Sequence, residues 1–291
     1  MKYGTTVNRW TTLSPDPLAS LVESTDGDPA RSRMWSEMLD GYGVSDIASM
    51  VFEDRFGSWG FLDLWRDAGD KPFSRRELDL LRGIAKVVTA AMRRCQAQLF
   101  RPVPSPAVPS PSVPTPSLPP GPVVLLLSPE LEVRDQTPEA QDYLRILLPP
   151  GAGQEPIPAA AYNVAAQFLA REEGVDDHPA SARVHLENGL WLTFRASRFR
   201  GEGTGGSEQP DIAVTIGETS PIRRAELFSR AFGLSLRERE LLGHLASGQD
   251  TRSVASTMFL SQNTVQDHLK SIFAKTGVHS RPALLSLARG A

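Results

Sequence analysis

The hydrophobic pattern near the C-terminus predicts a series of short helices. Apolar residues recur there at intervals of three and four, the spacing that gathers them on one helix face. Each periodic stretch follows a residue suited to the N-cap of a helix, namely Ser235, Asp250, Ser261 or Ser280. With an amphipathic stretch at residues 222–233, the pattern predicts a connecting helix and then an all-α four-helix domain over residues 234–291.

The third of these helices is predicted to have two contrasting faces. One stripe is apolar apart from a histidine, which we interpret as a packing residue: Val265, His268, Leu269, Ile272 and Phe273. The opposite face carries polar, short or cationic side chains: Asn263, Gln266, Asp267, Lys270, Ser271 and Ala274. Side chains of this kind can reach base edges and phosphates in a DNA major groove.

Upstream, the pattern changes to strands mixed with helices, which predicts two α/β modules. In residues 1–100 two aromatic-rich strands, 47–53 and 59–65, flank a Gly-containing turn, and a capping box at Ser74 opens a long helix. In residues 123–221 the expected order is two strands, two helices and three strands: 123–127, 131–135, 138–147, 159–171, 182–186, 190–199 and 212–216. The fold class is therefore multidomain α+β.

Between these modules lies a segment that can form neither sheet nor continuous helix. Residues 102–122 contain ten prolines in 21 positions, and proline lacks the backbone donor that both structures need. We interpret residues 101–122 as a linker of polyproline II character.

Charge and composition narrow the function classes. The chain has a net charge of −3, but residues 223–291 hold ten Lys/Arg and five Asp/Glu, so this segment is +5 and the rest −8. A basic C-terminal unit on an acidic body favours a polyanionic partner there. No apolar run is long enough to span a membrane and no secretory signal precedes the first module, so we expect a cytoplasmic protein.

Catalysis and metal binding have no support in the sequence. The single Cys95 lacks nearby ligand spacing, and the Gly-rich residues 201–206 are not followed by the Lys-Ser/Thr of a phosphate loop. We therefore predict no enzyme activity, no metal and no cofactor. Five tryptophans are interpreted as packing residues, with pocket lining as the alternative: Trp10, Trp35, Trp59, Trp65 and Trp191.

The C-terminal segment resembles the DNA-binding domain of the bacterial LuxR family. The likeness covers about 57 residues and rests on a string of spaced matches: Leu234-Ser235-Leu236-Arg237-Glu238-Arg239-Glu240-Leu241-Leu242, Ala246-x-Gly248, Val254-Ala255, Ser261-x-x-Thr264-Val265-x-x-His268-Leu269, Ile272-x-x-Lys275-x-Gly277-Val278 and Ser280-Arg281. The resemblance implies a DNA-binding transcription regulator whose helix-turn-helix spans residues 251–270, with the helix from about Thr264 in the major groove.

The resemblance also implies which side chains meet DNA: Arg252, Ser261, Asn263, Thr264, Gln266, Asp267, Lys270 and Ser271. Gln266 can pair with adenine, Asp267 can accept from cytosine N4, and Lys270 can reach guanine or phosphate. Asp267 is the main departure from the family pattern. An anion near phosphates is unfavourable unless it accepts a hydrogen bond from a base. Lys275 is expected either to pair with Glu238 or Glu240 or to contact DNA.

The two upstream modules resemble sensor domains. Residues 1–100 look like the later half of a GAF domain, and residues 123–221 are similar in element order to a small PAS domain. These resemblances imply sensory control by a small-molecule signal of unidentified chemistry. The expected partners are double-stranded promoter DNA and a second copy of the chain, with RNA polymerase as a further candidate.

Two other interpretations remain open at this point. A sigma factor region also carries a helix-turn-helix with an Arg-Glu-Arg opening, although it lacks the series from His268 to Ser280-Arg281. A ligand-sensing protein without a DNA role would share the upstream modules.

Overall fold

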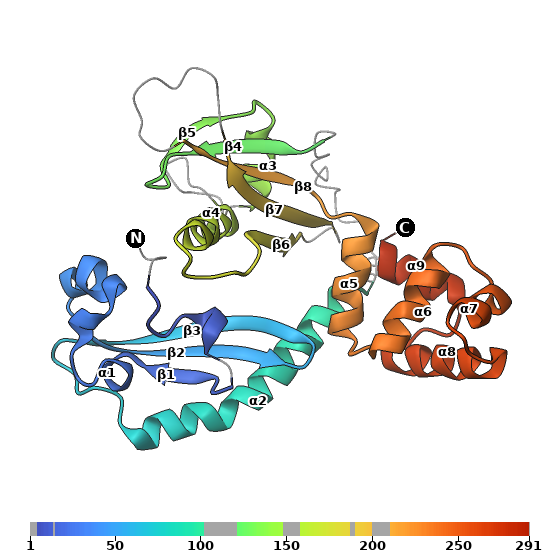
Figure 1. The fold of residues 1–291 in the computed structure, drawn as a ribbon, viewed down its shortest axis with the longest axis horizontal. Coiled ribbons are helices and arrows are strands. Elements are labelled where there is room, and N and C mark those ends of the chain that lie inside the picture. The colour runs from blue at the N-terminus through green and yellow to red at the C-terminus, as the bar shows by residue number, and fades with distance from the viewer. Residues whose placement is uncertain are drawn as a thin grey trace, which may run out of the picture. The chain divides into compact units, whose positions relative to one another are not determined.

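The computed structural model describes residues 5–13, 15–101, 121–147, 158–186, 190–199 and 210–290 (Figure 1). The chain forms two compact units. The first holds most of a three-stranded sheet and all of a five-stranded sheet, and the second holds the tip of one hairpin, the later half of a long helix and the C-terminal helices. Most of the predicted linker, the turn at 187–189 and the Gly-rich loop at 201–206 lie outside the described residues.

The first sheet is built around one long hairpin. Its strands run in the order β1 (Leu18–Ser20), β2 (Val44–Asp54) and β3 (Gly57–Asp67), and the long helix α2 (Arg75–Gln98) follows. The two aromatic-rich strands and the helix are confirmed. The sequence pattern missed β1 and the short helical elements before the hairpin: η1 (Trp10–Thr12), α1 (Leu21–Ser24), η2 (Pro29–Arg31), η3 (Trp35–Leu39) and η4 (Asp40–Tyr42).

A buried carboxylate joins several of these pieces. Asp46, on β2, is fully buried. It accepts hydrogen bonds from the Ser20 hydroxyl at 3.0 Å, the Val22 amide at 3.0 Å and the Phe73 amide at 2.9 Å. Because a buried charge is tolerated only when it is fully hydrogen-bonded, Asp46 ties β1, α1 and the approach to α2 to the central strand.

The second sheet is antiparallel and has five strands in the order β5-β4-β8-β7-β6. The strands are β4 (Val123–Leu127), β5 (Val133–Gln136), β6 (Ser181–His185), β7 (Trp191–Arg198) and β8 (Ile212–Glu218). Helices α3 (Ala140–Leu147) and α4 (Ala159–Glu172) come between β5 and β6 in the chain. The core lies between sheet and helices, where Phe194 and Tyr143 are fully buried. The predicted element order is thus confirmed here.

Five helices complete the chain: α5 (Pro221–Ala231), α6 (Leu236–Ala246), α7 (Thr251–Thr257), α8 (Gln262–Thr276) and α9 (Arg281–Arg289). The connecting helix and the four-helix domain are therefore confirmed, with ends within a few residues of those predicted. Ser235 and Glu238 form a reciprocal capping box at the start of α6, and Gly277 ends α8 in the left-handed conformation.

Aromatic contacts and one arginine hydrogen bond hold α5 in place within the second unit. Phe228 of α5 is fully buried and meets Phe100 edge to face at a centroid distance of 5.5 Å. The guanidinium of Arg230 donates to the Phe56 carbonyl at 2.6 Å. These contacts hold α5 against the end of the α2 segment and the hairpin tip, and α5 also contacts α9.

Candidate nucleic-acid interface

Helices α7 and α8 form a helix-turn-helix whose two N-termini are capped by side chains. The Asp250 carboxylate accepts from the Ser253 amide at 2.7 Å, and the Ser261 hydroxyl accepts from the Thr264 amide at 3.1 Å. Both bonds satisfy helix-terminal amides that otherwise lack partners. The capped turn fixes where α8 begins and therefore which side chains open its first turn.

The apolar stripe of α8 holds that helix against the rest of the domain. Val265 and Ile272 are fully buried and Leu269 is nearly so. Helix α8 contacts α6 and α7, and those segments also bury apolar side chains: Leu241, Leu242, Leu245, Val254 and Met258. His268 is half-buried at the margin of the stripe. Since each buried aliphatic side chain contributes about 1.5–3 kcal/mol of transfer free energy, this stripe sets the rotation of α8 about its axis.

The opposite face of α8 is open to solvent. Exposed side chains there are Asn263, Gln266, Asp267, Lys270 and Ala274. Ser261 and Arg252 are also exposed, whereas Thr264 is half-buried with its hydroxyl 2.9 Å from that of Ser261. The Lys270 ammonium lies 3.1 Å from the Asp267 carboxylate, and both side chains are about three-quarters exposed, at 76% and 73%.

The helical pattern places Ser271 on the exposed polar face of α8, but in the structure it is only partly exposed. Its side chain is half-buried, and its hydroxyl donates to the Glu238 carboxylate at 2.6 Å. The 100° step per residue places Ser271 at the edge of the polar face, and the carboxylate on α6 draws it inward. The Ser271 hydroxyl thus already donates to a partner inside the domain, and its contact with DNA stays a prediction.

Lys275 pairs with Glu238, which was one of the expected alternatives. Its ammonium donates to both carboxylate oxygens of Glu238, at 2.8 and 2.6 Å. The Ser235 amide donates to the same carboxylate at 2.6 Å. Glu240 instead pairs with Arg237 on the surface. One buried carboxylate therefore links the first turn of α6 to the last turns of α8.

The environment of Glu238 shifts its titration. Burial by itself would raise the pKa, but hydrogen bonds from Lys275, Ser271 and the Ser235 amide outweigh burial and lower the pKa of Glu238 from 4.5 to about 2. The ionised form is thus the one that the folded domain stabilises.

The turn between the two helices holds a bulky residue in an unusual backbone conformation. Phe259 has a φ of 56°, in the left-handed region that favours glycine, and its side chain is 95% exposed. Its amide donates to Ser256 and the next amide, of Leu260, to Ala255, which closes the end of α7. The Phe259 side chain gains almost nothing from burial in return for this backbone strain.

With this geometry established, comparison with known proteins identifies the domain. Residues 233–288 match the family described as "Bacterial regulatory proteins, luxR family". The match begins just after α5, covers α6 to α8 and nearly all of α9, and leaves the two upstream modules unassigned, so their likeness to GAF and PAS domains stays a prediction.

Curated relatives match part of the chain. The chain is 37% identical over 83 residues to "Probable HTH-type transcriptional regulator GfsR" of Streptomyces halstedii, covering 28% of this chain and 34% of that protein. It is 43% identical over 54 residues to "Probable transcriptional regulatory protein SgaR" of Hyphomicrobium methylovorum, covering 19% and 26%. The chain thus spans only about a quarter to a third of these relatives.

One solved structure also aligns, "Crystal structure of the Vibrio cholera VqmA-Ligand-DNA complex provides molecular mechanisms for drug design", at 18% identity over 58% of this chain and 81% of that chain. Its TM-score of 0.23 is too low to support an argument about fold.

The C-terminal domain is a LuxR-type helix-turn-helix domain. A domain of this class supports assignment as a DNA-binding transcription regulator. No helix among the described residues is long and apolar enough to cross a membrane, and the described His, Cys, Asp and Glu side chains form no group that could hold a metal ion.

The Glu238 cluster predicts an acid-sensitive domain. Because the folded pKa is depressed, the contribution of Glu238 to stability is complete above pH 4.5 and is lost as the pH falls towards 2. Allowing for the partly exposed lysine, we expect a loss on the order of 2 kcal/mol. Amide hydrogen exchange of α6 and α8 in the intact chain should show this fall. Glu238→Gln should flatten the dependence, whereas Glu240→Gln should leave it unchanged; a parental slope in Glu238→Gln would contradict this assignment.

The backbone at Phe259 predicts a stabilising substitution. Phe259→Gly removes the Cβ penalty of the left-handed conformation, worth roughly 1–2 kcal/mol, partly offset by the greater chain entropy of glycine. The net expectation is a gain of about 0.5–1 kcal/mol, measured by thermal unfolding. Phe259→Ala keeps the Cβ and serves as the matched control, with little change expected. Equal stability of the two variants would show that the backbone is not strained there.

Proposed function

We propose that this protein is a transcription regulator that binds promoter DNA through the α7–α8 helix-turn-helix as a homodimer, under the control of its GAF-like and PAS-like modules. The observation that carries the proposal is the exposed polar face of α8, held outward by the buried stripe of Val265, Leu269 and Ile272. The luxR family match over residues 233–288 supports this assignment over a sigma factor region.

The chemistry of that face suits a major groove. Gln266 has an amide that can pair bidentately with adenine, and Asp267 has acceptors for the amino group of cytosine. Around them, Arg252, Ser261, Asn263 and Thr264 supply a cation and polar donors near the N-termini of α7 and α8, where phosphate contacts are favoured. Base contacts would then come from the middle of α8 and backbone contacts from its start and from α7.

Lys270 has an internal partner that it would exchange on binding. Its ion pair with Asp267 is highly exposed, and such pairs contribute only about 0–1 kcal/mol. A phosphate or a guanine can therefore displace the carboxylate at little cost. Asp267 in turn becomes free to accept from a cytosine amino group, which resolves the difficulty of an anion beside the DNA backbone.

A homodimer would present two copies of α8 to two half-sites about one helical turn apart, roughly 34–36 Å. Pseudo-palindromic operators are the expected consequence. RNA polymerase is the further partner through which such a protein would act on transcription.

The experiment separates base reading from backbone contact. A duplex selected from a random library supplies the target site. Lys270→Ala should weaken binding and make its dependence on salt shallower, by about one counterion per lost phosphate contact. Gln266→Ala should lose selectivity at one position of each half-site, worth about 1–3 kcal/mol. Fluorescence anisotropy against a salt series and a panel of altered sites measures both effects.

Matched controls are available on α2, where Lys86 and Gln98 are also exposed. Lys86→Ala and Gln98→Ala should bind as the parent does. Unchanged affinity and selectivity in both Lys270→Ala and Gln266→Ala would show that α8 does not enter the groove in this way.

A further inference from the structure

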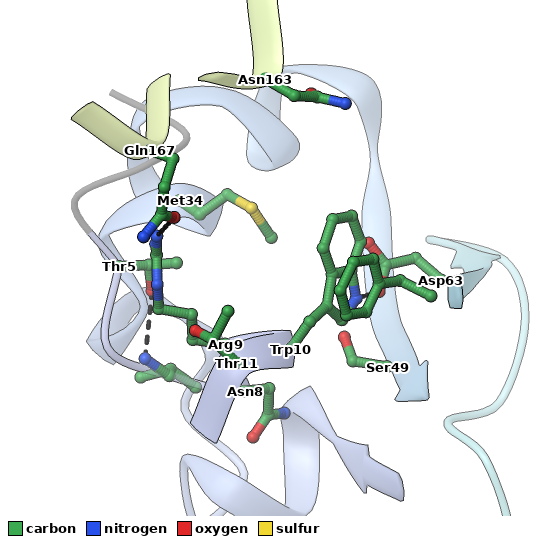
Figure 2. A pocket seen from close by; sticks show the side chains of 12 residues that line it. Thr5, Asn8, Arg9, Trp10, Thr11, Met34, Ser49, Asp63, Asn163 and Gln167 are labelled. Carbon is green, nitrogen blue, oxygen red and sulfur yellow. Dashed lines mark hydrogen bonds between the residues drawn. The ribbon is translucent and has the colours of Figure 1, made fainter. Parts of the chain in front are cut away.

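A cavity lies within the first unit. Its volume is about 210 Å³. Its walls come from the N-terminal segment around Trp10, from β2 and β3 of the first sheet, and from α4 beside the second sheet (Figure 2). Trp10, one of the five tryptophans of the sequence, therefore lines a pocket.

The apolar part of the wall suits a flat ring. The rings of Trp10 and Phe61 are stacked at a centroid distance of 4.9 Å and an interplanar angle of 9°. Met34 extends towards Trp10 from the other side of the cavity (Figure 2). Aromatic rings and a polarisable thioether both favour contact with a planar, polarisable group.

Cavity size limits that group to one or two rings. A dry cavity of ~150 Å³ accommodates benzene, and this one is somewhat larger. The space therefore suits a single substituted ring or a small fused pair.

The charged side chains of the wall already have partners. Arg9 donates from Nε to the Asp176 carboxylate at 2.6 Å and from Nη2 to the side-chain Oε1 of Gln167 at 2.7 Å. Asp63 accepts from the indole N–H of Trp10 at 2.9 Å. An anionic ligand would lose its hydration without gaining a free cation, because Arg9 is already paired with Asp176. The site therefore disfavours an anion.

Polar groups at the cavity offer both donors and acceptors. The carboxamide of Asn163 extends from α4 over the cavity (Figure 2), and the hydroxyl of the buried Ser49 comes from β2. The buried side-chain nitrogen of Asn8 has no hydrogen-bond partner among the described residues, a costly state that native structures rarely retain. A ligand with a carbonyl and an N–H group matches this set.

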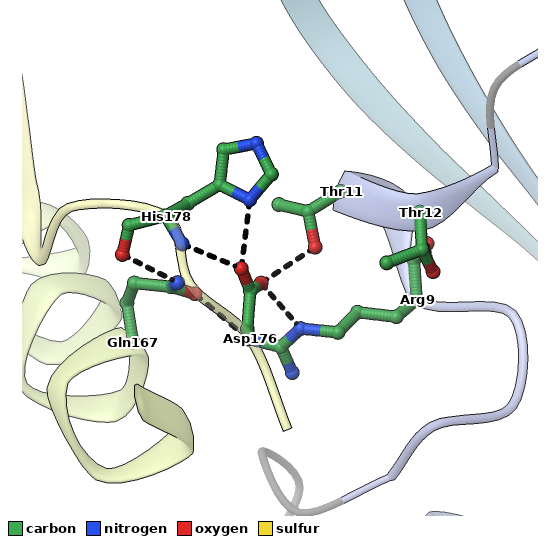
Figure 3. Close-up of polar contacts among 6 residues, drawn as sticks. All are labelled: Arg9, Thr11, Thr12, Gln167, Asp176 and His178. Carbon is green, nitrogen blue, oxygen red and sulfur yellow. Dashed lines mark hydrogen bonds and ion pairs between the residues drawn. The ribbon is translucent and has the colours of Figure 1, made fainter. Parts of the chain in front are cut away.

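The wall is fixed in place by a buried ionic cluster (Figure 3). The Asp176 side chain is only 1% exposed. It accepts from Arg9, from the Thr11 hydroxyl at 2.6 Å and from the His178 amide at 2.8 Å. Since Arg9 and Thr11 flank Trp10 in the chain, this cluster anchors the aromatic wall to the segment after α4. The cavity is thus preorganised, which lowers the entropic cost of binding.

We propose that this cavity binds a small uncharged aromatic carboxamide or lactam, stacked against Trp10 and hydrogen-bonded to Asn163 and Ser49. A molecule there touches the N-terminal segment, the first sheet and α4 together. Its role as a regulatory signal rests on the proposed DNA-binding function, whereas the binding site itself does not.

Benzamide is the probe, titrated into the full-length protein by isothermal calorimetry. We expect saturable binding of one molecule per chain with a Kd below about 1 mM, within the range for a ligand of this size. Benzoate, which has nearly the same shape but carries a charge, should bind at least about tenfold more weakly, because burying its charge has no compensating partner.

Two variants and one control locate the site. Ser49→Leu should fill the cavity and abolish binding, and Asn163→Leu, at an exposed position of α4 where folding is not at risk, should weaken it at least about tenfold. Ser181→Leu, at the exposed start of β6 outside the cavity, should bind benzamide as the parent does.

Absence of saturable binding up to 10-millimolar benzamide overturns the proposal, as does equal affinity for benzoate or parental affinity in Asn163→Leu. Lys270→Ala should still bind benzamide normally. Binding of benzamide without binding of any DNA duplex would contradict the proposed DNA-binding function and support the ligand site. Binding of a duplex without binding of benzamide would support the DNA-binding function and contradict the ligand site.

Discussion

The carboxylate of Glu238 is the contact on which the geometry of the C-terminal domain depends. It is nearly inaccessible to solvent and is held by the Ser235 amide, the Ser271 hydroxyl and the Lys275 ammonium. Because these donors come from the start of α6 and the end of α8, the carboxylate fixes two helices that hydrophobic packing alone would allow to slide. Packing of aliphatic side chains is not directional, whereas a buried charge with three donors admits one arrangement. The face that α8 turns outward is therefore set by a polar contact as well as by its apolar stripe.

Buried carboxylates with several hydrogen-bond donors also occur in the first unit. Asp46 and Asp176 are buried carboxylates with several donors each, and each gathers segments too short or irregular to hold position by themselves. Burial would raise the pKa of Asp176, but hydrogen bonds from Thr11, His178 and Arg9 lower it far below its ordinary value. The carboxylate therefore stays ionised, and its contacts stay intact, throughout the physiological pH range. Short segments that bury little surface of their own gain a fixed position in this way.

Sequence reasoning succeeded where local signals determine structure. Caps at Ser235, Asp250, Ser261 and Ser280 and the periodic apolar residues of α8 located the C-terminal helices, because capping and amphipathicity act within a few residues. They located the exposed residues of α8 as well, although the contact of these residues with DNA is still a prediction. Ser271, expected on the exposed face, is half-buried because its hydroxyl bonds to Glu238, 33 residues away in the chain. The cavity escaped notice for the same reason: Arg9 and Asp176 are 167 residues apart, and no periodicity connects them. The three-residue strand β1 is too short to produce a pattern, and its position depends on β2 and Asp46.

The ion pair between Lys270 and Asp267 has a consequence for competition among polyanions. Lys270 is already paired with Asp267, so any nucleic-acid phosphate that binds Lys270 must first displace that carboxylate. The ion pair therefore lowers the affinity of Lys270 for phosphates in general. In the proposed complex, a cytosine amino group at the target site would give the displaced Asp267 a new donor, and other sequences would not. The ion pair would then weaken binding to arbitrary nucleic acid more than binding to the target site, in a domain with an excess of basic residues.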